Sequence, residues 1–127
     1  MVMHILDWLV RILGLDAPVV ATGAPPRSSQ WQTVRRRFLN ANPTCAACGQ
    51  SDGLEVHHVV PFHVDRSLEL EPSNLITLCG SDCHYLFGHL KDWTSWNKNV
   101  RTDCQVFLIQ VRNRPKINAS LARAGES

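Results

Sequence analysis

The sequence predicts a small α+β domain, and three observations point to that class. The chain has 127 residues, 44% hydrophobic and 19% charged, which suffices for one domain with a modest core. Two short strand-like segments lie near the middle, separated by a long polar loop and followed by a helical segment. Two closely spaced cysteine pairs bracket these segments, and helical patterns flank them. This length excludes multi-domain enzymes and multi-helix membrane bundles.

The segment 1–16 has the pattern of a short amphipathic helix. Its apolar residues recur at helical spacing: Ile5, Leu6, Leu9, Ile12 and Leu13. It is shorter than the ~20 apolar residues that span a bilayer, and it lacks the basic start of an export signal. We expect this helix to pack on the domain or on a partner protein, with a membrane surface as the alternative.

Residues 17–29 are rich in Pro, Gly and Ser, which predicts a linker. A second helix is expected to begin at Ser29, because Ser29 and Gln32 have the spacing of a capping box. This helix should end at Asn42, since Pro43 disfavours helical backbone in the residue before it.

Charge is unevenly spread along the chain, whose formal net charge is +2. Residues 52–92 carry seven acids and two bases, whereas residues 93–127 carry six bases and two acids, and residues 27–37 carry four arginines and no acid. An acidic middle suits bound cations, and basic flanks suit a polyanion. We expect phosphate contacts from the basic patch on the second helix, with a merely solvated surface as the alternative. This patch consists of Arg35, Arg36 and Arg37.

The cysteines have the spacing of a metal site. Cys45 and Cys48 are separated by two residues, Cys79 and Cys83 by three, and the pairs by thirty. Such a pattern predicts tetrahedral zinc held by four thiolates, with a structural role because no coordination position stays open. Disulfides are the alternative, but without an export signal we expect a cytoplasmic protein, in which they are rare. Cys104 is left over and is expected to be a buried thiol.

The segments between and after the cysteine pairs carry the polar residues of interest. The predicted order is a strand at 54–61, a loop at 61–73, a strand at 74–78 and a helix at 83–90. His57 and His58 lie on the first strand, where successive side chains point to opposite faces. Asn74 opens the second strand, and His84 opens the helix.

As a set, these residues resemble the HNH endonuclease family, the ββα-metal nucleases, in its small free-standing bacterial and phage form. The resemblance rests on His57-His58, Asn74 and His84 within the two cysteine pairs, and it covers residues 45–90. No single element would be specific. The resemblance implies a ββα-metal core within residues 30–111, stapled by the structural zinc and flanked by helices.

The resemblance also implies roles for individual residues. His58 matches the general base that takes a proton from the attacking water. Asn74 matches the residue that ties down the loop and helps to hold the base. His57 and His84 match ligands of one catalytic divalent ion, which would be Mg²⁺, Mn²⁺, Ni²⁺ or Zn²⁺.

Whether His89 is a third ligand of this ion is less clear from its spacing. Relatives often add a ligand one helical turn after His84, which here would be Gly88, and glycine has no side chain to coordinate. His89 follows, but five residues around a regular helix leave two side chains about 140° apart. Either Gly88 permits a distortion that lets His89 bind the ion, or His89 has another role such as phosphate contact.

The function implied is metal-dependent hydrolysis of DNA phosphodiester bonds without a small-molecule cofactor. The alternative is a zinc-dependent DNA-binding module without catalysis. Downstream, Trp93 and Trp96 are expected on one helical face packed against the cysteine site, with base stacking as the alternative. Residues 104–111 form an apolar run of strand or helix, and residues 112–127 are expected to be a loose basic tail.

Overall fold

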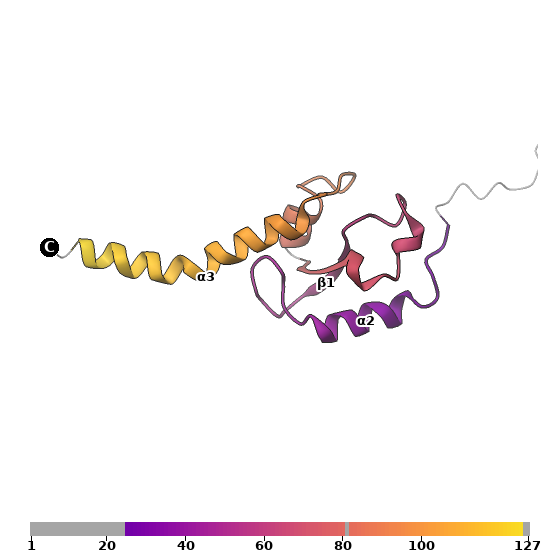
Figure 1. Cartoon of the computed structure of the whole chain (residues 1–127), viewed down its shortest axis with the longest axis horizontal. Coiled ribbons are helices and arrows are strands. Elements are labelled where there is room, and N and C mark those ends of the chain that lie inside the picture. The colour runs from indigo at the N-terminus through magenta and orange to yellow at the C-terminus, as the bar shows by residue number, and fades with distance from the viewer. Residues whose placement is uncertain (1–24, 81, 126–127) are drawn as a thin grey trace, which may run out of the picture.

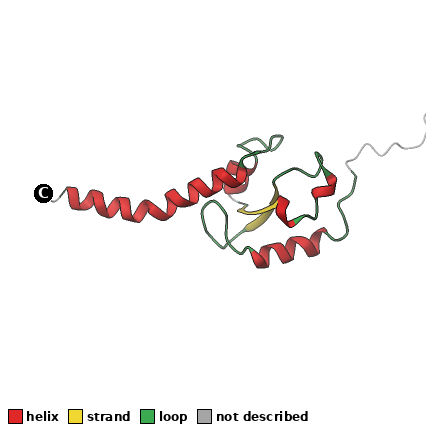
Figure 2. Cartoon of the chain, viewed as in Figure 1, coloured by secondary structure: helices red, strands yellow, loops and turns green. Residues whose placement is uncertain are grey.

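The computed structural model describes residues 25–80 and 82–125, and it confirms the α+β class (Figures 1 and 2). The expected helix at 1–16 and most of the expected linker lie outside the described residues. The principal elements are α2 (Trp31–Ala41), β1 (Leu54–His58), β2 (Leu75–Cys79), the single π-helical turn η3 (His84–Gly88) and α3 (Val100–Ala124). Two 3₁₀ turns, η1 (Arg66–Leu68) and η2 (Pro72–Asn74), lie in the loop between the strands. Among the described residues, no helix is both long enough and apolar enough to cross a membrane.

The two strands form an antiparallel sheet on which the rest of the domain is built. Leu54 lies opposite Cys79, and His58 lies opposite Leu75. Every residue of β2 is buried. The core joins this strand to the cysteine cluster and to the start of α3, through Cys45, Ala47, Ile76, Leu78, Cys79, Cys83, Val100 and Cys104. Three of these eight residues, Cys45, Cys79 and Cys83, are metal-ligand candidates, so a bound ion would be part of the core.

Helix α2 packs against β1 and begins two residues later than expected. Its first residue, Trp31, is 7% exposed. The predicted capping box does not form, because Ser28 takes that place: its Oγ accepts from the amide of Gln30, and its carbonyl accepts from the amide of Trp31. The expected end is confirmed, since Asn42 caps the helix with hydrogen bonds from its amide and its side chain to the carbonyl of Phe38.

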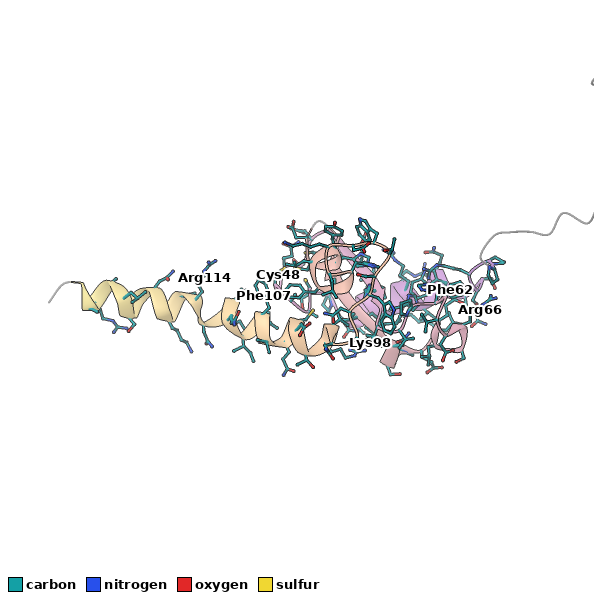
Figure 3. The ribbon with its side chains drawn as sticks, turned by 90° about the horizontal axis from the view of Figure 1, so that it is seen from above. Cys48, Phe62, Arg66, Lys98, Phe107 and Arg114 are labelled. Carbon is teal, nitrogen blue, oxygen red and sulfur yellow. The ribbon has the colours of Figure 1, made fainter. Side chains whose placement is uncertain are left out.

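Helix α3 decides one open expectation about the C-terminal part and corrects another. Residues 104–111 are helical, and the segment 112–124 is the second half of the same helix rather than a loose tail. Pro115 lies inside the helix, where its fixed φ is compatible but one backbone hydrogen bond is lost. The first half packs through buried Cys104, which confirms the expected core thiol, and through Phe107 on Phe87. The second half projects from the domain with exposed side chains such as Arg114 (Figures 1 and 3).

Candidate metal centres

The four cysteines form one cluster, and their geometry fits zinc. All four Sγ atoms lie within 4.8 Å of one another, and those of Cys48 and Cys79 are 4.0 Å apart. A tetrahedral site with Zn–S bonds near 2.3 Å has edges of about 3.8 Å. All the described cysteines are free thiols, which argues against the disulfide alternative.

Local backbone geometry shapes this cluster. Gly49 has a φ of +79°, which favours glycine, and its amide bonds to the carbonyl of Cys45. In the second pair, the amide of Cys83 donates to Cys79 Sγ at 3.4 Å. Gly80, within the second cysteine pair, does not have a positive φ. Its lack of a side chain matters for space instead, because a Cβ there would lie 2.7 Å from the carboxyl carbon of Glu55.

The four thiols of this cluster could all be ionised only with a cation bound among them. Burial raises the pKa of the Cys48 and Cys83 thiols. Burial also acts to raise the pKa of Cys79, but hydrogen bonds from Cys83 and from the amide of Asp82 outweigh it and lower this pKa to about 7. Four neighbouring thiolates would repel one another, so full ionisation requires a cation among them.

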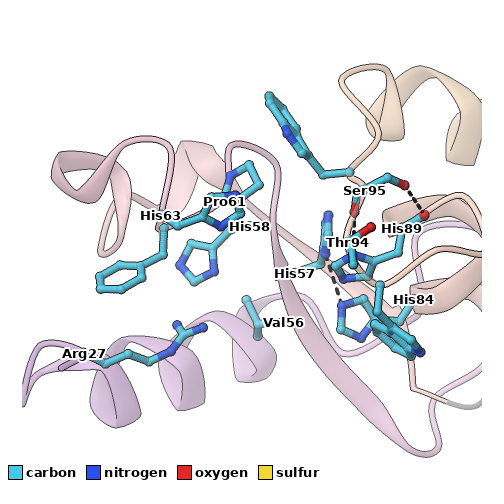
Figure 4. A pocket seen from close by; sticks show the side chains of 13 residues that line it. Arg27, Val56, His57, His58, Pro61, His63, His84, His89, Thr94 and Ser95 are labelled. Carbon is cyan, nitrogen blue, oxygen red and sulfur yellow. Dashed lines mark hydrogen bonds between the residues drawn. The ribbon is translucent and has the colours of Figure 1, made fainter. Parts of the chain in front are cut away.

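A second cluster gathers three histidines from two elements. His57 comes from β1, His84 opens η3, and His89 follows it directly. One ring nitrogen from each lies within 4.8 Å of the others, and each pair of ring centroids is 5.0 Å apart (Figure 4).

The π-helical turn explains how His84 and His89 meet. A π-turn bonds residue i to i+5, so residues five apart lie on the same side, unlike in a regular helix. Gly88 is buried against the histidine rings, and a Cβ there would lie 3.0 Å from the His57 ring and 3.1 Å from the His84 ring. Of the two possibilities that the sequence left open, the structure therefore has the distorted helix, and Gly88 leaves room for the cluster.

Hydrogen bonds orient two of the three rings. His84 Nδ1 donates to Glu55 Oε2 at 2.6 Å, and His89 Nδ1 donates to the carbonyl of Ser95 at 2.8 Å. Because each neutral ring has one donor and one acceptor nitrogen, both Nε2 atoms keep their lone pairs. This arrangement is typical of histidines that bind metals.

His57 completes a donor set that fits a divalent ion. Burial, followed by the neighbouring His84, His89 and His58, lowers the pKa of His57 to about 3, which keeps the ring neutral. Its Nδ1 lies 3.1 Å from His84 Nε2, and its Nε2 is buried without a hydrogen-bond partner. Two nitrogens bound to one zinc-like ion at 2.0–2.1 Å would be about 2.8–3.4 Å apart. The distance fits His57 Nδ1 and His84 Nε2 as two ligands of one metal ion.

His58 points to the other face of β1, as the period of two predicts. Its ring lies on Trp31, with centroids 4.6 Å apart, and its Nε2 donates to the carbonyl of Glu69 at 2.9 Å. Since that carbonyl can only accept, Nδ1 is the free acceptor nitrogen. Burial lowers the pKa of His58, so the ring is neutral and able to take a proton near pH 7.

Asn74 holds the loop that supports His58. Its Oδ1 accepts from the amide of Val60 at 2.8 Å, and its Nδ2 donates to the carbonyls of Val60 and Leu68 at 3.0 and 3.2 Å. One buried side chain thus fastens both ends of the loop. The residue after Leu68 provides the carbonyl that orients His58.

Both faces of β1 open into one pocket of about 310 Å³. The histidine cluster and His58 line it, together with the exposed His63 (Figure 4). Arg27 also lines it, with its guanidinium 5.0 Å from the Trp31 ring centroid, although sequence reasoning did not single it out. The one sequence feature that could have indicated a role for Arg27 was its position in the basic segment 27–37.

The expectation for the tryptophans was wrong in its geometry. Residues 93 and 96 lie in a loop before α3, not on a helix. Trp93 is 60% exposed and packs on His84 and His89, with centroids 5.6 and 4.8 Å away, so it borders the pocket rather than the cysteine cluster.

The arginine patch of α2 is not part of this pocket. Arg36 and Arg37 are exposed, and Arg35 is half-buried. Within the described part of the chain, none of the three side chains forms a hydrogen bond or ion pair. The patch is therefore available to a partner, and its role stays a prediction.

The fold is compatible with a ββα-metal domain. It has a two-stranded antiparallel sheet followed by a short helical turn, and the histidine cluster takes its residues from β1 and from this turn. A four-cysteine cluster lies beside them. Residues 45–86 match the family model described as HNH endonuclease. The resemblance to HNH endonucleases drawn from the sequence is therefore confirmed for this segment. No curated protein and no solved structure matches the chain.

Proposed function

We propose that this protein is a metal-dependent endonuclease that hydrolyses DNA phosphodiester bonds. One observation carries the proposal: three histidines converge on one face of β1 while His58 has an acceptor nitrogen on the other, and both faces line the same pocket. A structural zinc module alone would need only the cysteines.

The proposed roles follow from the hydrogen bonds. His58 Nδ1 takes the proton from the attacking water, while the Glu69 carbonyl holds the ring and shares the resulting positive charge. Asn74 keeps that carbonyl in place through the loop. A divalent ion held by His57, His84 and His89 would neutralise phosphate charge and stabilise the departing oxygen. Three imidazoles favour Mn²⁺, Ni²⁺ or Zn²⁺ over Mg²⁺.

The test is cleavage of supercoiled plasmid by protein that holds one equivalent of zinc, titrated with Mn²⁺ or Ni²⁺. We expect metal-dependent nicking or linearisation, together with loss of binding of the added ion in His84→Ala and in His89→Ala. His63→Ala is the matched control, because it removes a pocket histidine outside the cluster and should leave ion affinity unchanged. Binding of DNA without cleavage under any of these ions would favour the non-catalytic DNA-binding module instead.

Phosphate contacts are proposed for Arg27 and for the patch of Arg35, Arg36 and Arg37. In a His58→Ala background, which prevents cutting, each Arg→Ala that removes a contact should flatten the log–log salt dependence of duplex binding by about 0.9. Three consecutive helical residues span about 200° of the circumference, so at least one of the three in the patch should be nearly neutral. Binding of an unrelated duplex across a salt series measures both effects.

The same series distinguishes the patch from the projecting helix. If all three single variants of the patch keep the parent affinity and slope, the patch is only a solvated surface. The phosphate contacts would then be sought on the second half of α3, which carries exposed Arg112, Arg114 and Lys116 and no acidic residue after Asp103.

A further inference from the structure

Glu55 is a carboxylate beside the histidine cluster that the family pattern does not assign. It lies on β1 two residues before His57, so both side chains point to the same face of the strand. Its Oε2 accepts a hydrogen bond from His84 Nδ1 at 2.6 Å. The Glu55 side chain is 48% exposed, so the contact with His84, rather than burial, holds it in place.

The backbone at Gly80 leaves space for the carboxylate of Glu55. Gly80 bonds through its amide to the carbonyl of Gly53, which brings the end of β2 against the start of β1. A Cβ on Gly80 would lie 2.7 Å from the carboxyl carbon of Glu55 and 2.9 Å from its Oε1. Any larger residue at position 80 would therefore push the carboxylate away from His84.

A second acid near the cluster, Asp92, forms its side-chain hydrogen bonds elsewhere. Asp92 lies close to His89 in sequence, but its Oδ1 accepts from the amide and hydroxyl of Thr94. His89 is oriented instead by the backbone carbonyl of Ser95. Glu55 is thus a carboxylate in direct hydrogen-bond contact with a ring of the cluster.

We propose that Glu55 is a positioning residue that sets the affinity of the histidine cluster for its divalent ion, acting through His84. By accepting the proton of Nδ1, the carboxylate holds His84 in the tautomer whose Nε2 lone pair faces the cluster. Its negative charge also makes that nitrogen a stronger donor. This inference rests on the proposed metal centre.

The test is calorimetric titration of the full chain, holding one equivalent of zinc, with Ni²⁺. Removal of such a partner typically lowers metal affinity 10–100-fold. Glu55→Ala should show a loss in this range, and Glu55→Gln, which keeps an acceptor without the charge, should show a smaller one. Glu71→Ala is the matched control, because it removes one exposed negative charge from another loop and should bind Ni²⁺ like the wild type.

Gly80→Ala tests the same contact from the other side. It should lower Ni²⁺ affinity while Glu55 is present, and it should add nothing in the Glu55→Ala background. Zinc content and melting temperature of each variant distinguish this effect from damage to the cysteine cluster.

The outcomes separate the two proposals. A wild-type protein that binds no second ion would refute the metal centre and the role of Glu55 together. A wild type that binds Ni²⁺ and a folded Glu55→Ala that binds it within twofold would refute the role of Glu55 alone, because the cluster would then not depend on its carboxylate.

Discussion

Replacing His58 by alanine should lower the rate of DNA cleavage by about 10²–10⁴-fold while leaving Ni²⁺ affinity unchanged. The reason is that the proposed general base and the proposed metal ligands lie on opposite faces of β1. His58 points away from the three clustered histidines, and its acceptor Nδ1 is the nitrogen placed to take a proton. Single-turnover cleavage of a plasmid, with Ni²⁺ titrations in parallel, measures both parts of the expectation.

The structure supplies a sharper control for the same substitution. The His58 ring lies on Trp31 and lines the pocket, so alanine leaves a space the size of an imidazole. Added imidazole should restore part of the lost rate in His58→Ala, whereas it should not rescue His84→Ala, which loses an ion ligand. A folded His58→Ala protein with most of the wild-type rate would refute the assignment of the general base.

The parts of the site that the sequence predicts well are those encoded by local spacing. The two cysteine pairs predict a four-thiolate cluster, because the close spacing within each pair brings its two thiols together in a short turn. The opposite directions of the His57 and His58 side chains follow from the two-residue period of a strand. The strands observed at 54–58 and 75–79 agree closely with those expected at 54–61 and 74–78.

The parts that the sequence could not predict depend on contacts across the fold. The place of His89 depends on a π-turn that helical periodicity does not predict, in which Gly88 packs against the rings of His57 and His84. Arg27 is thirty residues from His57 and reaches the pocket because α2 packs on β1. Helix α3 continues past Pro115, where composition suggested a tail, although a proline inside a helix costs one backbone hydrogen bond.

Replacing Cys79 by serine should unfold the domain, because the cysteine cluster expected to bind zinc is part of the core. Cys79 is buried on β2, and its sulfur contacts Cys48 Sγ and accepts the amide of Cys83. Structural zinc contributes about 10–16 kcal/mol of apparent binding energy, whereas a small domain is stable by only about 5–15 kcal/mol. We therefore expect no cooperative thermal transition in the variant, and the same loss when a strong chelator removes zinc from the wild type.

Cys104 provides the matched control for this prediction. It is as buried as Cys79, but it lies outside the cluster and packs at the start of α3. Cys104→Ser should cost only about 1–3 kcal/mol, the cost of burying a hydroxyl, and should keep its zinc. Melting followed by circular dichroism, together with the zinc released by a thiol-modifying reagent, compares the two variants directly. A Cys79→Ser protein with the wild-type melting temperature and no thiol-released zinc would show that the cysteine cluster does not hold the domain together.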